Sequence, residues 1–235
     1  ASLDVKILAR WIPTGCSSLD RALEGGLKPG GTTLLYGEAE TGKTTLAMQC
    51  AVNCARMGYK TLYVDCDGTF SPERLSQIVS QDFEEISEFL IIIEPASFRE
   101  QIETVDNLEK YVSKRFGLII FDTITSLYRS ELGGKKETFN LNRELNRQVA
   151  VLSQIAKALE VSVVLLSQVR SIVGETDIAP VATRVLKFWS NSVISLERTG
   201  RRNIIRASVE KSHGKEAGLT LYLVIEEDGL HDHNR

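Results

Sequence analysis

The sequence lacks several features that would place it at once in a class of proteins. Its 235 residues contain no apolar run of the ~18 residues that a membrane-spanning helix needs. The first residues show no basic stretch followed by an apolar one, which a secretory signal would have. Acidic residues outnumber Lys and Arg, giving a formal net charge of −3, so nucleic acid would have to bind local basic patches. These absences predict a cytoplasmic protein without a membrane partner.

Soft metal ligands are also few. None of the four cysteines lies in the CxxC spacing of a zinc site, and Cys50 and Cys54 stand one helical turn apart among small apolar residues. We therefore expect buried free thiols. The histidines His231 and His233 belong to the polar C-terminal stretch HDHNR, and we predict that residues 230–235 form a frayed tail.

The sequence does contain short β-rich runs that alternate with longer helical patterns, which is typical of a mostly parallel sheet flanked by helices. The predicted strands are 32–37, 60–66, 89–94, 118–122 and 161–168, and the predicted helices are 43–57, 72–81, 98–115 and 139–160. Three further strands, 190–198, 202–211 and 219–229, should pair antiparallel at one edge. Two segments, 130–136 and 171–182, are predicted to be irregular. The chain 1–235 therefore reads as one α/β domain with an N-terminal arm at 1–12.

A phosphate-binding loop follows the first predicted strand. The stretch GEAETGKTT, residues 37–45, matches GxxxxGK[ST] at every fixed position. Its glycines allow backbone N–H groups to turn toward a phosphate, while Lys43 supplies a positive charge and Thr44 can ligate Mg²⁺. The predicted nucleotide-binding residues are Gly37, Glu38, Ala39, Glu40, Thr41, Gly42, Lys43, Thr44 and Thr45.

Acidic residues end two of the other predicted strands. Asp122 follows the apolar run LIIF and is predicted to orient the Mg²⁺ shell together with Thr44. In VDCDGTF, residues 64–70, Asp65 and Asp67 lie two positions apart at a glycine turn. Hydrolysis of a phosphate needs a group that positions and deprotonates water, and Asp67 is our candidate. The alternative is that Asp67 only caps the turn at Gly68.

With these motifs the chain resembles the RecA/RadA recombinase superfamily over nearly its whole length, and within it an archaeal branch of paralogues. The superfamily is indicated by TGCSSLDRALEGGLKPG (14–30), YVDCDGTFSPERL (63–75), FDTITSLYR (121–129), LNRELNRQVAVL (141–152) and LLSQV (165–169). The branch is indicated by FSPERL, SFREQ (97–101), VLKFWSNSVISLER (185–198) and the lack of a helix-hairpin-helix domain before residue 13. The resemblance implies a RecA-like P-loop ATPase core that binds ATP with Mg²⁺ and assists a RadA-type recombinase in DNA recombination and repair.

The resemblance also implies roles for single residues. Asp67 falls where recombinases carry a catalytic Glu, and its shorter side chain implies slow hydrolysis. Arg74 matches the arginine that stacks on adenine. Gln168 matches the glutamine that senses the γ-phosphate and signals to the DNA loops, since an amide can bridge two partners without a change of charge. Lys211 lies near the position from which an arginine finger would act on a neighbouring subunit, a hypothesis in which the chain forms an oligomer.

Two loops of the superfamily bind single-stranded DNA, and they correspond to residues 128–138 and 170–184. Their basic residues here are Arg129, Lys135, Lys136, Arg170 and Arg184. These residues are either DNA contacts or ordinary solvated loop charges. Because residues 1–12 contain no phenylalanine, the Phe-x-x-Ala polymerisation segment of true recombinases has no match, and we do not expect autonomous filaments. Two other functions stay open: a KaiC-like regulatory ATPase without DNA binding, and an interaction protein gated by nucleotide.

Overall fold

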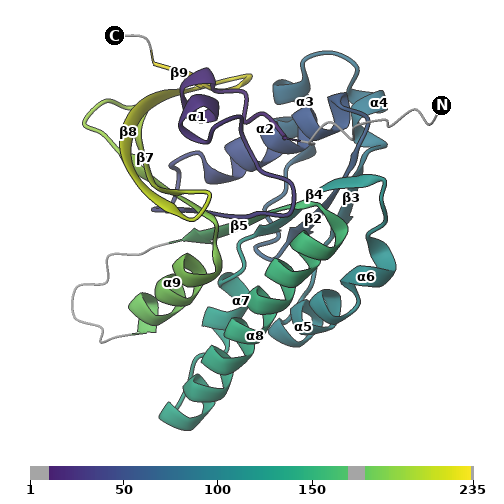
Figure 1. Cartoon of the computed structure of the whole chain (residues 1–235), viewed down its shortest axis with the longest axis vertical. Helices are drawn as coiled ribbons and strands as arrows, with labels where there is room; N and C mark the ends of the chain where they lie inside the picture. Colours follow the sequence, from purple (N-terminus) through teal and green to yellow (C-terminus); the bar gives the residue numbers. More distant parts are fainter. Residues whose placement is uncertain (1–10, 169–177, 234–235) are drawn as a thin grey trace, which may run out of the picture.

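The computed structural model describes residues 11–168 and 178–233. Within these residues nine strands form one sheet, in the order β3-β2-β4-β5-β1-β6-β7-β8-β9. Helices cover both faces of the sheet (Figure 1). The predicted α/β class, with antiparallel strands toward the C-terminal edge, is confirmed.

The parallel part of the sheet consists of apolar strands. These are β1 (Thr32–Gly37), β2 (Lys60–Asp65), β3 (Leu90–Ile93), β4 (Phe116–Asp122) and β5 (Ser162–Gln168). Every residue of β4 is buried, as expected for a strand covered on both faces. The register pairs Gly37 with Gln168 and Asp65 with Asp122, so the carboxyl ends of β1, β2, β4 and β5 meet at one edge, where ligands of such sheets bind.

The C-terminal strands continue the same sheet. β6 (Ser192–Arg198) pairs parallel with β1, and β7 (Ile204–Ser212), β8 (Lys215–Glu226) and β9 (Gly229–Asp232) follow antiparallel.

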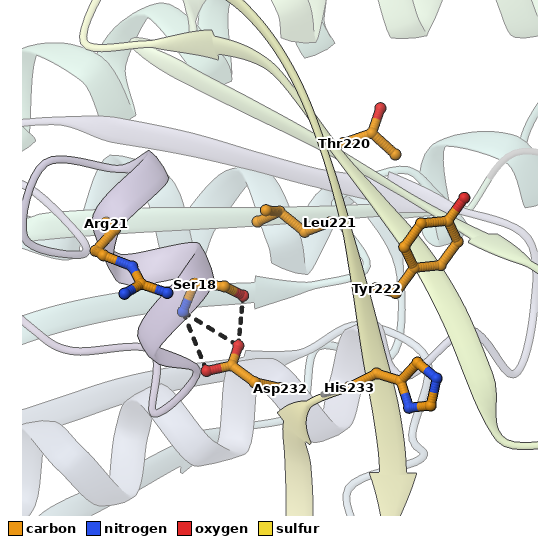
Figure 2. A pocket seen from close by; sticks show the side chains of 7 residues that line it. All are labelled: Ser18, Arg21, Thr220, Leu221, Tyr222, Asp232 and His233. Carbon is orange, nitrogen blue, oxygen red and sulfur yellow. Dashed lines mark hydrogen bonds between the residues drawn. The ribbon is translucent and has the colours of Figure 1, made fainter. Parts of the chain in front are cut away.

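The prediction of a frayed tail from residue 230 is therefore wrong for its first three residues. Leu230 is completely buried, and both carboxylate oxygens of Asp232 accept from the backbone N–H of Ser18 at 3.1 Å. Figure 2 shows this contact beside a cavity of about 450 Å³, which is lined by residues of α1, β8 and β9 and of the segment that follows β9. Strand β9 therefore connects the edge of the sheet to Ser18, a residue of α1.

Two layers of helices enclose two hydrophobic cores (Figure 1). One face carries α1 (Ser17–Ala22), α2 (Lys43–Arg56), α3 (Pro72–Val79) and α4 (Phe83–Ser87). The other face carries α5 (Phe98–Asp106), α6 (Leu108–Tyr111), α7 (Ser126–Ser130), α8 (Lys135–Leu159) and α9 (Ile178–Trp189). All four cysteines are buried thiols, as expected. None of these helices is both long and apolar enough to span a bilayer.

Several predicted boundaries need correction, among them the strand predicted at 219–229, which corresponds to β8 and the turn before β9. The helix predicted at 98–115 is interrupted at Asn107, whose side-chain amide donates to the carbonyl oxygen of Glu103 at 2.7 Å and competes with the helical backbone. The segment predicted to be irregular at 130–136 contains the end of α7 and the start of α8, which begins after the extended residue Gly134. The irregular segment 171–182 overlaps α9, whose first turn accommodates Pro180.

Candidate nucleotide site

The loop between β1 and α2 is shaped by its two glycines. A Cβ atom on Gly37 would lie 2.1 Å from the carbonyl oxygen of Leu196 on β6, so only glycine allows this approach. Gly42 caps α2 in the left-handed conformation (φ 85°), which favours glycine. Its neighbours are Ile225 of β8 and Leu230 of β9. The loop therefore presents the N-terminal end of α2, with its unpaired N–H groups, to the ligand edge of the sheet.

Lys43 is buried inside this loop. Its ammonium donates to the carbonyl oxygen of Glu38 and, at 3.4 Å, to the hydroxyl of Thr41. Burial lowers the lysine pKa to about 8, while the carboxylates of Asp122 and Asp67 act in the opposite direction. The same two acids that were predicted for metal binding and catalysis are thus within electrostatic reach of the predicted phosphate-binding lysine.

Asp122 is a buried carboxyl at the end of β4, exposed by only 2%. It accepts a hydrogen bond from the Tyr63 hydroxyl at 2.6 Å and another from Thr44. Burial raises its pKa to about 6, although both hydrogen bonds act to lower it. A desolvated carboxylate beside a threonine hydroxyl supplies the hard oxygen ligands that Mg²⁺ prefers. The donor set therefore fits the metal that the sequence predicts.

The two acids of VDCDGTF have different environments. Asp65 is buried and accepts from the backbone N–H of Phe70 at 2.7 Å and of Asp67 at 3.3 Å. Asp65 therefore caps this turn, which is the alternative role that the sequence leaves open for Asp67. Asp67 is exposed, and its carboxylate accepts from the Thr123 hydroxyl at 3.4 Å. The exposed acid is free to meet a water molecule.

Gln168 lies at the carboxyl end of β5, directly beside Gly37 in the register. The guanidinium of Arg129, on α7, donates to its carbonyl oxygen at 2.9 Å and approaches its side-chain oxygen at 3.5 Å. Arg129 also contributes to the low pKa of Lys43. The structure thus brings the predicted sensor together with a residue predicted to contact DNA.

Arg74 is engaged by the β8–β9 turn. Its guanidinium donates to the carbonyl oxygens of Glu226 at 2.9 Å and Glu227 at 2.5 Å. It is half-buried, and its stacking on adenine stays a prediction.

The predicted DNA residues are spread over α7, α8 and α9. Lys136 and Arg184 are exposed, Lys135 is the first residue of α8, and Arg170 lies outside the described residues. Two exposed aromatics that the sequence reading missed lie on the same helices, Phe139 on α8 (66% exposed) and Phe188 on α9 (75%). They are candidate stacking surfaces for bases beside basic side chains.

Lys211 is held within its own chain. Its ammonium donates to the carbonyl oxygen of Ser190 at 2.7 Å. A role in a neighbouring subunit would require this bond to break.

Two residues contact the site although neither was predicted to belong to it. Tyr63 supports Asp122, and Arg198 contacts the phosphate loop from β6. Tyr63 belongs to an apolar strand and contacts a residue 59 positions away, and Arg198 ends a strand and contacts one 159 positions away. The local sequence around either residue does not indicate these contacts.

Comparisons with known proteins agree with this architecture. The Rad51 family model matches residues 6–233. The chain is 33% identical to the DNA repair and recombination protein RadB of Methanococcoides burtonii, over 96% of this chain and 100% of the relative. It is 36% identical to RadB of Thermococcus onnurineus, over 94% and 97%.

A solved structure agrees as well. The crystal structure of the RadB recombinase superposes with a TM-score of 0.82 and 34% identity, covering 95% of this chain and all of that one. These matches confirm the resemblance to the archaeal branch and support a recombination role, and they give no support to a KaiC-like regulator. The chain belongs to the Rad51 family.

Proposed function

We propose that this chain is a RadB-like accessory protein of homologous recombination and DNA repair. It binds ATP with Mg²⁺, hydrolyses it slowly, binds single-stranded DNA and assists a RadA-type recombinase in the cytoplasm. The observation that carries the proposal is the meeting of Lys43, Thr44 and Asp122, which come from two separate strand ends, around a glycine-shaped loop.

Each residue has a defined task in this proposal. The loop amides and Lys43 bind the phosphates, and Thr44 and Asp122 hold the Mg²⁺, which neutralises charge on the phosphate oxygens. Asp67 accepts a proton from water, and its short side chain keeps the reaction slow. Arg74 stacks on adenine when it leaves the β8–β9 turn.

The link to DNA passes through Gln168 and Arg129, because these residues touch each other, Gln168 lies beside Gly37 of the loop, and the charge of Arg129 acts on Lys43. Arg129 and the other basic residues of the two segments contact the phosphates of the strand.

Two assays on the purified protein test the proposal. We expect slow, Mg²⁺-dependent ATP turnover and retardation of single-stranded DNA on a gel, with turnover lost in Lys43→Ala. Turnover without any DNA retardation would favour the KaiC-like alternative. The accessory role predicts co-purification with a RadA-type recombinase, measured with and without ATP at two salt concentrations. Failure to co-purify under all four conditions would contradict that role.

A further inference from the structure

Arg198 reaches the phosphate loop from the end of β6. Its Nη2 atom donates to the carbonyl oxygen of Ala39 at 2.9 Å and to the carboxylate of Glu40 at 2.8 Å, and its Nε atom lies 3.3 Å from the same carbonyl. The close approach of β6 that Gly37 permits brings this strand beside the loop. Arg198 follows Leu196 by two positions and so projects toward the same face of the sheet. One side chain therefore binds two consecutive residues of the loop.

The contacts of Arg198 matter because the backbone of the loop is strained at Glu40. This residue has φ 59°, in the left-handed region where a side chain is strained and glycine is not. Arg198 contacts the peptide oxygen just before the bend and the side chain at the bend itself. These contacts favour the left-handed conformation of Glu40 over the extended ones that a non-glycine residue prefers.

The contact also affects the charge of the loop. Glu38 and Glu40 are acidic residues inside a segment that is to bind a polyphosphate. The ion pair with Arg198 partly offsets the charge of Glu40, and water screens it because the Glu40 side chain is 84% exposed. Arg198 is also a minor cause of the lowered pKa of Lys43, after burial and the charge of Arg129.

We propose that Arg198 is a positioning residue that holds the phosphate loop in its left-handed bend at Glu40 and thereby raises the affinity for ATP. The inference rests on the proposed function, because it concerns the same nucleotide site. A glycine at position 40 would adopt the left-handed conformation without help, whereas Glu40 needs the contacts of Arg198 to hold it.

A double-mutant cycle tests this role. The variants are Arg198→Ala, Glu40→Gly and the double variant, with ATP–Mg²⁺ affinity measured by calorimetry. Arg198→Ala should weaken binding by about two- to tenfold, the range of one or two hydrogen bonds. In the Glu40→Gly background the same change should have little effect, because glycine adopts the bend without help. Arg202→Ala, which removes an equal charge from the adjoining turn, is the matched control and should bind as the wild type does.

The outcomes separate the alternatives. An equal loss in both backgrounds would overturn the inference and make Arg198 a direct phosphate ligand, and no loss in Arg198→Ala would overturn it as well. If the wild type binds no nucleotide, the proposed function itself fails and this inference fails with it. A second readout needs no ligand: hydrogen exchange of the loop amides in the free protein should quicken in Arg198→Ala but not in the double variant, and equal exchange in all variants would count against the positioning role.

Discussion

At the scale of single residues, the buried carboxyl of Asp122 lowers the stability of the ligand-free protein at neutral pH. Its pKa is raised from 3.8 to about 6 in the fold by burial, so the folded state binds a proton more tightly than the unfolded state. Its contribution to stability is therefore complete below about pH 4 and is lost as pH rises through about 6.

This sign gives a prediction for Asp122→Asn without nucleotide or Mg²⁺. The substitution should raise the free energy of unfolding at pH 8 by up to about 3 kcal/mol, and by little at pH 4. Asparagine keeps an oxygen that can accept from Tyr63. Urea unfolding at the two pH values checks this, and an equal effect at both would contradict the argument.

Asp67 and Asp65 differ in what their replacement should do. If the reach of Asp67 limits hydrolysis, Asp67→Glu should raise the single-turnover rate by an order of magnitude, since small misplacements of a catalytic group are costly. Asp65→Ala is the control: it removes the turn cap and should lower stability without raising the rate. An unchanged rate in Asp67→Glu would argue against Asp67 as the base.

The sequence predicts those residues of the candidate site that belong to a spaced motif. Lys43, Thr44 and Asp122 follow from a loop pattern and a strand end, and the structure brings them together. The contacts of Arg198 and Tyr63 depend on which strands become neighbours in the sheet. No local pattern encodes such a contact, so the sequence alone does not predict it.

At the scale of elements, α7 and β5 are linked through Arg129 and Gln168. If this link carries the nucleotide signal, Arg129→Ala should abolish the dependence of DNA affinity on ATP. Lys136→Ala, an exposed charge on α8, should only weaken DNA binding and reduce the slope of log affinity against log salt by about one. Fluorescence anisotropy with labelled single strands separates the two results. ATP dependence that survives in Arg129→Ala would disprove the link.

The strand β9 is part of the core, so truncating its buried side chain should lower the stability of the fold. Leu230 is fully buried, and its backbone N–H donates to Gln49 at 2.8 Å. Leu230→Ala should cost about 2–5 kcal/mol of folding free energy, as for other buried leucines. Chemical denaturation measures this. A loss well below 1 kcal/mol would restore the frayed tail that the sequence suggested.

The accuracy of the predicted elements follows from burial. β1 matches its predicted range because its residues are almost all buried and its apolar pattern is strong. The first turn of α8, before residue 139, was not predicted because its side chains, among them Lys136 and Glu137, face solvent and show no apolar period. β9 was not predicted because Leu230 is its only apolar residue and the residues after it are polar. The Asp228-Gly229 pair is a hairpin signal that could have located this strand.

At the scale of the whole molecule, the sheet joins distant parts of the chain into one ligand edge. β1, β4 and β5 place the loop, Asp122 and Gln168 next to each other. The C-terminal strands complete this edge, since β6 brings Arg198 to the loop and residues of β8 and β9 pack against Gly42. The overall charge of −3 gives no general attraction to DNA, so the proposed DNA binding would depend on the local basic residues of α7, α8 and α9.

Calorimetric titration with ATP tests the central claim most directly. The wild type should bind ATP about tenfold or more tightly with Mg²⁺ than with a chelator present. Asp122→Asn should lose that difference, because the variant keeps the loop and Lys43 but lacks the metal-side carboxylate. Equal Mg²⁺ dependence in the wild type and in Asp122→Asn would contradict the site as it is described.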